Sequence, residues 1–316
     1  MTARAKPAAP LSLKWRYPLD RPAILGAVML APAVIYILVL VAAPLVLAIA
    51  YSVSDVKVGD QSLDFVGLRN FRNVWHDPVF QESLKNTVIF TLVSQALVIV
   101  LANILALALT TEFRGKWIVR FLILLPWTTP IALGAIAWLW LLDSIFSPID
   151  WTLREVGLLG PGTLLGPANN LFWLAKGDLA RISVIIVHVW RMLPLATVIL
   201  LAGLTSIPQD IKDAAAVDGA GFWRQLFQIT IPLTAPIIAV AVLFGVIFTF
   251  TDMTVVYVLT RGGPVNSTQV LASWAFIRGI QGGDLAQGSA IAIFFLPVLV
   301  AVAVIVLRLA RRTEVR

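Results

Sequence analysis

The sequence predicts an all-α, polytopic membrane protein with about six transmembrane helices. Hydrophobic residues make up 59% of the 316-residue chain and charged residues only 13%, whereas soluble domains average about 45–50% and about 25%. The apolar residues fall in long blocks that short polar segments join. These blocks are continuous and do not alternate with polar residues, which favours membrane-spanning helices over the strands of a membrane barrel. The composition therefore excludes an ordinary soluble enzyme.

A bilayer core requires about 20 mostly apolar residues per helix. Six segments reach this length: residues 23–51, 85–111, 121–142, 182–205, 232–260 and 286–308. The first of them could be mistaken for a secretory signal, because Ala48 and Ala50 imitate a cleavage site. Its apolar block is nearly twice as long as the about 7–15 residues of a signal core, so we assign it to a span. Residues 23–308 then form one transmembrane domain.

The distribution of charge orients these spans. With the amino terminus in the cytoplasm, 14 of the 24 Lys and Arg residues fall on inner segments and 9 on outer ones. The inner segments then carry a net charge of +8 and the outer ones −1, as the positive-inside rule requires. Residues 1–22 and 309–316 are therefore expected to be cytoplasmic tails. The overall charge of +7 reflects membrane topology, and we expect no nucleic-acid partner.

Several kinds of site are absent from the sequence. There is no cysteine, and the two histidines, His76 and His188, are too far apart in sequence to predict a metal site. The one Gly-Lys pair, Gly115-Lys116, lacks the upstream glycine of a phosphate-binding loop. We therefore expect no enzymatic activity, no metal and no nucleotide on this chain. Transport against a gradient would have to be driven by an ion or by another chain.

The third inner segment, residues 206–232, predicts two short helices around a glycine turn. Ser206 with Gln209 fits a capping box at the start of the first helix. The run 214–216 is all alanine and offers a surface that another backbone can approach closely. Gly219 would supply the left-handed residue that ends this helix.

The second helix of this segment is amphipathic and leads into the fifth span, which Pro232 opens. Its apolar face is formed by Phe222, Leu226, Phe227 and Ile229. Physical reasoning alone leaves open whether the segment is only an amphipathic helix at the membrane interface.

The same segment resembles the EAA loop of permeases from ATP-binding-cassette importers. That motif reads E-A-A, three residues, G, nine residues and I-x-L-P. This chain has Asp213-Ala214-Ala215, then Gly219, then Ile229-Thr230-Ile231-Pro232 at identical spacing. Asp213 replaces the glutamate with a shorter acidic arm, and Ile231 replaces the leucine.

In that family the loop docks on an ATPase subunit and transmits its closure to the spans. The resemblance implies a coupling element composed of Asp213, Ala214, Ala215, Asp218, Gly219, Ala220, Ile229 and Pro232.

Two outer segments are similar to those of carbohydrate permeases of the maltose type. The first is Phe65-Val66-Gly67-Leu68-Arg69-Asn70-Phe71, followed by Asn86-Thr87. The second is Tyr257-Val258-Leu259-Thr260-Arg261-Gly262-Gly263-Pro264, followed by Thr268. The resemblance covers residues 23–308 and identifies this chain with the first of the two permease subunits found in that group.

Two ionisable residues fall within predicted spans, Arg191 in the fourth and Asp252 about two turns inside the outer end of the fifth. Such residues are costly in hydrocarbon and mark candidate functional sites. Either residue could line a substrate route or pair with a neighbouring helix. Aromatic rings bind the C–H faces of sugars, and the candidates are Trp138, Trp140, Trp190 and Tyr257. His188 is expected to be a packing residue.

The resemblance implies the permease subunit of an ATP-driven importer for a di- or oligosaccharide or a related polyol, in the bacterial inner membrane. Its implied partners are a second homologous permease, two ATP-binding subunits that carry ATP and Mg²⁺, and an extracytoplasmic solute-binding protein. The alternative is an ion-coupled secondary transporter that works alone on a small polar solute.

Overall fold

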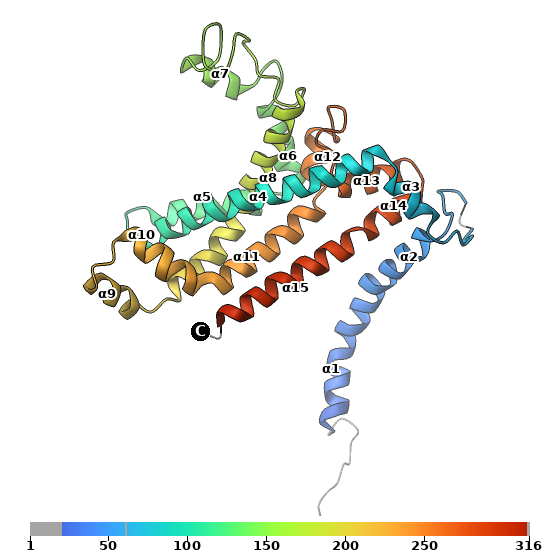
Figure 1. Cartoon of the computed structure of the whole chain (residues 1–316), viewed down its shortest axis with the longest axis horizontal. Coiled ribbons are helices and arrows are strands. Elements are labelled where there is room, and N and C mark those ends of the chain that lie inside the picture. The colour runs from blue at the N-terminus through green and yellow to red at the C-terminus, as the bar shows by residue number, and fades with distance from the viewer. Residues whose placement is uncertain (1–20, 61, 315–316) are drawn as a thin grey trace, which may run out of the picture. The chain divides into compact units, whose positions relative to one another are not determined.

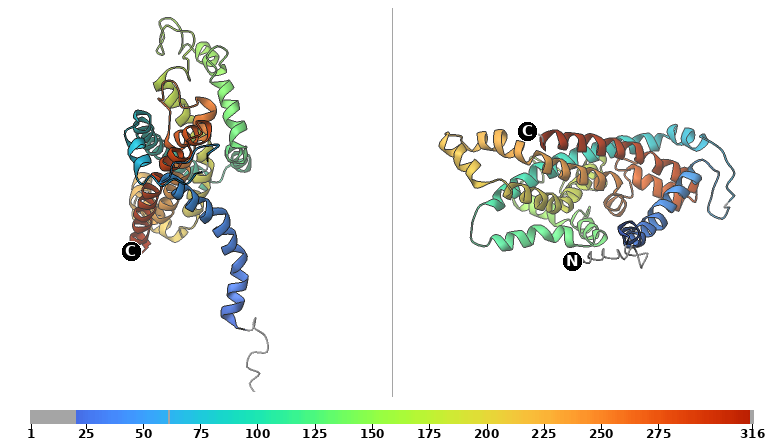
Figure 2. Two further views of the ribbon diagram at one scale, coloured as in Figure 1. Left: turned by 90° about the vertical axis from the view of Figure 1, so that its right-hand side faces the viewer. Right: turned by 90° about the horizontal axis from the view of Figure 1, so that it is seen from below.

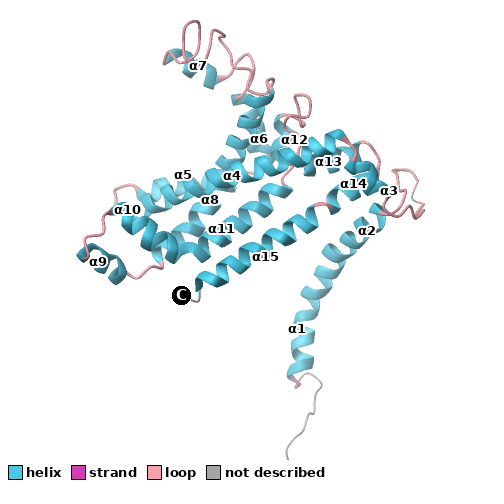
Figure 3. Cartoon of the chain, in the orientation of Figure 1, coloured by secondary structure: helices cyan, strands magenta, loops and turns pink. Residues whose placement is uncertain are grey.

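The computed structural model describes the backbone of residues 21–60 and 62–314. Most of the predicted amino-terminal tail and the last two residues of the carboxy-terminal tail lie outside these ranges. The chain divides into two compact units, residues 1–50 and 51–316. Figure 3 shows that helices and connecting loops make up the described part of the chain. The β pairing in the described part of the chain consists of two isolated bridges, one of which joins Ser54 and Phe65.

The first unit is built on one long helix. It comprises α1 (Pro22–Ile37), the π-helical segment η2 (Leu38–Ala42) and α2 (Ala43–Ser52), whose last two residues belong to the second unit. Residues Ala23–Ser52 are long and apolar enough to cross a membrane. Their hydrophobic side chains are largely exposed within this chain. An all-round apolar helix of this kind is typical of a membrane span.

Four long helices form the bundle of the second unit (Figures 1 and 2). They are α4 (Pro78–Thr110), α8 (Gly177–Thr205), α11 (Ile231–Thr251) and α15 (Phe295–Glu314). The centre of the bundle packs small and branched residues at a four-residue spacing, with Val98, Ala102 and Ala106 of α4 against Met192 and Ala196 of α8. A four-residue spacing places side chains on one face of a helix, so the apolar pattern fixes which faces meet.

Five described helices are long and apolar enough to cross a membrane, or six if a bent pair counts as one span. This confirms the all-α polytopic fold class. The bent pair corrects the third predicted span, residues 121–142. It consists of α5 (Lys116–Thr128) and α6 (Ile131–Leu141), which meet at 99°. Pro130 disfavours helical backbone at the residue before it, and Thr129 is accordingly extended, with ψ 131°.

The fifth predicted span is also interrupted, whereas the sixth is one helix over Leu285–Arg308. Helix α11 ends at Thr251, Asp252 is extended with ψ 121°, and a separate helix α12 (Thr254–Leu259) follows. Asp252 therefore lies at a helix break and not inside the fifth helix as predicted. In the sixth, α14 (Leu285–Ile293) precedes α15, which continues beyond the predicted limit of residue 308.

Short helices lie in the segments between the spans. The described ones are α3 (Arg69–Trp75), α7 (Pro148–Glu155), α9 (Gln209–Val217), α10 (Phe222–Gln225) with η3 (Leu226–Thr230), and α13 (Leu271–Phe276) with η4 (Ile277–Gln281). A buried carboxylate organises the loop that carries α7, since Asp150 accepts hydrogen bonds from the Leu171 backbone N–H and the Trp173 indole. Nearby, the backbone N–H groups of Phe146 and Ile145 hold the pKa of Asp143 below its ordinary value.

Candidate transport site and coupling loop

The loop between α8 and α11 begins with the short helix α9. This helix ends in a complete glycine-based cap. Gly219 has φ +71°, the left-handed conformation expected from the sequence. Its N–H donates to the carbonyl of Ala216 (3.0 Å), and the next residue, Ala220, donates to the carbonyl of Ala215 (2.9 Å). These two bonds form a Schellman motif, which satisfies the last carbonyls of α9 and fixes the direction of the chain that follows.

The start of α9 differs from the prediction. No side-chain hydrogen bond caps this helix, whose first flanking residue is Pro208. Ser206 instead donates to the carbonyl of Gly203, and Gln209 donates to the carboxylate of Asp213 (2.8 Å). Ser206 has helical backbone at the end of α8, so its hydroxyl bonds back within that helix and the predicted capping box does not form.

The sequence predicted a separate second helix in the loop. In the structure this helix is not a separate element. Helix α10, the π-helical η3 and α11 form one helix over Phe222–Thr251. Ile229 is half-buried within η3, and Pro232 lies in the first turn of α11. The second half of the loop is therefore continuous with the fifth span, whereas the turn at Gly219 separates α9 from it.

The predicted coupling residues do not all lie at the surface. Asp213, Ala214, Asp218 and Gly219 are exposed, whereas Ala215 is 6% exposed and faces the chain itself. Val217, which the motif did not single out, is 88% exposed. The surface open to a partner is therefore formed around the end of α9, and it lies at the end of the bundle where α9 and α10 are seen in Figure 1.

A cluster of buried charges joins α8 to the break after α11. The guanidinium Nη1 of Arg191 lies 2.9 Å from Oδ2 of Asp252. Nδ1 of His188 lies 3.3 Å from the same oxygen. The other carboxylate oxygen accepts a hydrogen bond from the backbone N–H of Thr254, so Asp252 also caps α12. The two intramembrane charges predicted separately are thus partners of one another.

His188 is the member of this cluster that sequence reasoning missed. It is fully buried and packs edge-on against Phe90, which agrees with the expected packing role. Its Nε2 also lies 2.9 Å from the hydroxyl of Thr249, which itself donates to the carbonyl of Gly245. The spacing of three residues between His188 and Arg191 was the available signal, since it places them on one helix face.

The predicted aromatic residues separate into different environments. Trp138 of α6 and Trp190 of α8 form an edge-to-face pair with ring centroids 5.7 Å apart. Trp190 directly precedes Arg191 in α8, whereas Trp138 belongs to α6. Trp140 is 64% exposed. Tyr257 of α12 accepts a hydrogen bond from Gln281 of η4 and packs against Phe276 of α13.

Among the described residues, no group of three or more His, Cys, Asp or Glu could hold a metal ion. The polar atoms of the cluster bond chiefly to one another, with Asp252 accepting from Arg191 and from the backbone N–H of Thr254.

Comparison with known proteins identifies the family. Residues 98–315 match the family described as binding-protein-dependent transport system inner membrane components. This match covers most of the chain and includes the coupling loop, the charged cluster and three of the four bundle helices in full. The chain belongs to this family.

Individual relatives of this inner membrane component extend the similarity over nearly the whole chain. It is 31% identical to the trehalose/maltose transport system permease protein MalF of Thermococcus litoralis, over 95% of this chain and 97% of that protein. It is 28% identical to the sulfoquinovosyl glycerol transport system permease protein SmoG of Agrobacterium fabrum, over 92% of each. A crystal structure of a bacterial ABC transporter that imports alginate contains a similar fold, with a TM-score of 0.77 and 21% identity over 93% and 97% of the two chains.

Asp252 is expected to stabilise this inner membrane component through its ion pair. Replacing Asp252 with alanine leaves the partly buried Arg191 and the buried His188 without their carboxylate. Removing one partner of a buried pair costs about 3–5 kcal/mol, and the 23% exposure of Arg191 places the expected loss near the lower figure. Thermal unfolding in detergent measures this loss.

The matched control is Asp252→Asn, which keeps an acceptor for the backbone N–H of Thr254 and should lower the melting temperature less. A melting temperature of Asp252→Ala equal to that of the unmodified protein would show that the pair contributes nothing.

Proposed function

We propose that this chain is one of two homologous permease subunits of an ATP-driven importer for a sugar or a related polyol. The observation that carries the proposal is the loop of residues 206–232, whose spacing matches the EAA motif, whose α9 end is exposed, and whose second half is continuous with the fifth span. The relatives named for trehalose/maltose and sulfoquinovosyl glycerol support a carbohydrate as cargo.

In this mechanism the chain does no covalent chemistry and binds no nucleotide. Two ATPase subunits carry ATP and Mg²⁺ and grip the α9 end of the loop. Their closure moves the single helix Phe222–Thr251, which opens the path between the two permeases to the outside. An extracytoplasmic binding protein then delivers the sugar, and hydrolysis resets the spans. Both termini of the chain lie in the cytoplasm.

The sugar route passes the cluster of Arg191, Asp252 and His188 and the indole pair of Trp138 and Trp190. The cluster provides hydrogen bonds for hydroxyl groups, and the carboxylate of Asp252 balances the charge of Arg191. The indoles provide flat apolar faces for the C–H surfaces of a sugar ring. Trp140, two residues after Trp138 in α6, and Tyr257 of α12 complete the aromatic candidates.

The test is purification of the tagged chain with its partners, followed by reconstitution into vesicles that contain ATP and Mg²⁺. We expect an ATPase and a second permease to co-purify. Uptake of radiolabelled trehalose or maltose, presented with the binding protein, should require ATP and persist after an ionophore is added. Uptake by this chain alone, driven by an ion gradient, would instead establish the secondary transporter.

A further inference from the structure

His188 is the fully buried member of the charged cluster. Its side chain has no exposed surface, whereas the side chain of Arg191 is 23% exposed and that of Asp252 is 7% exposed. A solute at the surface of this chain can therefore touch Arg191, but it cannot touch the imidazole of His188. Any effect of His188 on such a solute must be transmitted through the groups that His188 contacts.

Two side chains of α8 meet a single oxygen of the Asp252 carboxylate. Nη1 of Arg191 lies 2.9 Å from Oδ2, and Nδ1 of His188 lies 3.3 Å from the same atom. The arginine side chain is long and has several rotatable bonds, so it holds a carboxylate less firmly than a short side chain does. The stiffer imidazole supplies the second point of attachment on α8.

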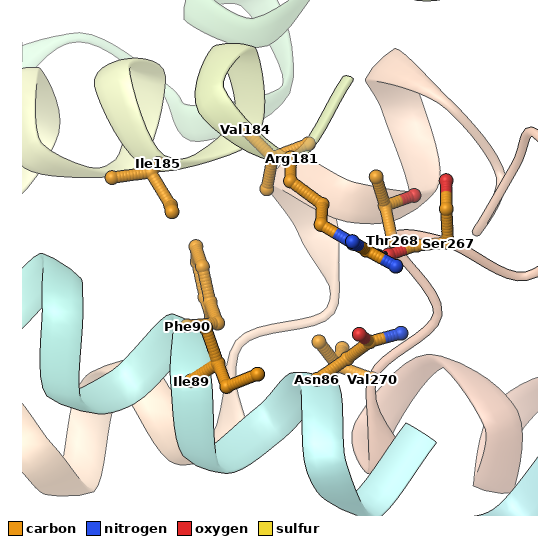
Figure 4. Close-up of a pocket in the computed structure, with 9 residues that line it drawn as sticks. All are labelled: Asn86, Ile89, Phe90, Arg181, Val184, Ile185, Ser267, Thr268 and Val270. Atoms are coloured by element: carbon orange, nitrogen blue, oxygen red, sulfur yellow. Dashed lines mark hydrogen bonds between the residues drawn. The ribbon is translucent and has the colours of Figure 1, made fainter. Parts of the chain in front are cut away.

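The imidazole ring is confined by α11 and α4. Its Nε2 lies 2.9 Å from the hydroxyl of Thr249, which donates to the carbonyl of Gly245 at 2.7 Å. Phe90 of α4 packs edge-on against the ring, with centroids 4.8 Å apart. Figure 4 shows that Phe90 also lines a narrow pocket, whose room of about 30 Å³ is that of roughly one water molecule. Because so little space is open beside Phe90, the ring of His188 is held closely in place.

These contacts join α8 to the break in the fifth span. Thr249 lies in the last turn of α11, and Asp252 lies in the break that follows. The backbone of Asp252 is extended, with ψ 121°, so helical geometry does not fix where its side chain points. The direction of the carboxylate is therefore set by its partners, which are His188, Arg191 and the backbone N–H of Thr254.

We propose that His188 is a positioning residue for the transported sugar. It fixes the Asp252 carboxylate, and the carboxylate in turn orients the partly exposed guanidinium of Arg191 toward the oxygen atoms of the sugar hydroxyl groups. This inference rests on the proposed function. His188 does not touch the sugar itself. Loosening the groups behind a binding residue weakens its action even where every residue in contact with the ligand is retained.

The test compares three replacements of His188 in the complete transporter, reconstituted with its binding protein and radiolabelled trehalose or maltose. Asparagine places its amide near the position of Nδ1 and keeps the contact with Asp252. Glutamine places its amide near the position of Nε2 and keeps only the contact with Thr249. Phenylalanine fills the volume of the ring and keeps neither polar contact. The measured quantity is the number of sugar molecules transported per ATP hydrolysed.

We expect His188→Asn to retain most of this ratio, and His188→Gln and His188→Phe to lower it by roughly three- to tenfold, the effect of one lost polar contact. A variant that is partly unfolded loses uptake and ATP hydrolysis together, so the ratio separates positioning from stability. If His188 only fills space, the order is reversed, because phenylalanine fills the site and the smaller asparagine leaves a cavity.

The reversed order, or equal ratios in all three variants, would overturn the inference. When the unmodified assembly transports the sugar only with ATP, such a result contradicts the role of His188 alone. Uptake by the unmodified assembly that does not require ATP would contradict the proposed function as well.

A second measurement asks whether His188 acts through Asp252. His188→Phe and Asp252→Asn should each lower the ratio of sugar to ATP. The double variant should be no worse than Asp252→Asn, because the carboxylate that His188 orients is already absent. Thermal unfolding in detergent confirms that the variants compared are folded. Losses that multiply in the double variant would show that His188 acts independently of Asp252 and would overturn the inference.

Discussion

Replacing Gly219 with valine is expected to abolish ATP-driven uptake while leaving the spans folded. The residue has φ +71°, and a β-branched side chain in that region costs about 1–3 kcal/mol. No atom lies within 4 Å of the position that a Cβ would take, so the effect comes from the backbone conformation and not from a collision. The Schellman motif then opens, and α9 no longer presents its exposed end in the orientation that the proposed ATPase partner requires.

Uptake into vesicles and co-purification of the ATPase measure this effect, and thermal unfolding checks the spans. Gly221 provides the matched control. It lies two residues further along the same loop, is equally open, and has an ordinary φ of −69°. Gly221→Val should therefore transport normally. Asparagine at position 219, which tolerates the left-handed region, should retain most of the uptake. Normal transport by Gly219→Val would show that the left-handed turn at Gly219 is not required for coupling.

Replacing Gly288 with valine is expected to prevent stable folding of the end of the bundle that carries α13 and α14. A Cβ on Gly288 of α14 would collide with the Cα of Gly279 and lie 3.0 Å from the carbonyl oxygen of Ala275. These are backbone atoms that no side-chain rotation can move away. Helix α14 and the segment α13–η4 must therefore separate, and overpacking of this kind costs about 1–3 kcal/mol or more.

The amount of protein in the membrane and its melting temperature measure this loss. Gly288→Ala should already lower the melting temperature, and Gly288→Val should reduce the amount of folded protein further. Gly26, in helix α1, has no atom within 4 Å of a Cβ position and serves as the control, since Gly26→Ala should be tolerated. If Gly288→Val has the stability of the unmodified protein, α14 and η4 do not pack as closely as the structure indicates.

Interruptions of the spans show where sequence reasoning reached its limit. Hydropathy identified the apolar segments because it sums over many residues, and it does not detect a change of direction within such a segment. Pro130 was visible in the sequence, yet prolines within other spans leave their helices unbroken, as Pro194 does in α8. The 99° bend at Thr129 thus depends on what α6 packs against, chiefly α12 and α8, and not on proline alone.

The sequence by itself determined the features that depend on local chemistry. Long apolar blocks specified the spans, and a glycine at fixed spacing after three alanines specified the left-handed cap at Gly219. The tertiary structure alone decided which distant side chains meet. Arg191 and Asp252 are 61 residues apart, and Asn86 lies 180 residues from Asn266. Such pairs form only when whole helices pack. The approach of the two side chains depends on the register and rotation of α4, α8 and α11, and residues adjacent in the chain do not determine these.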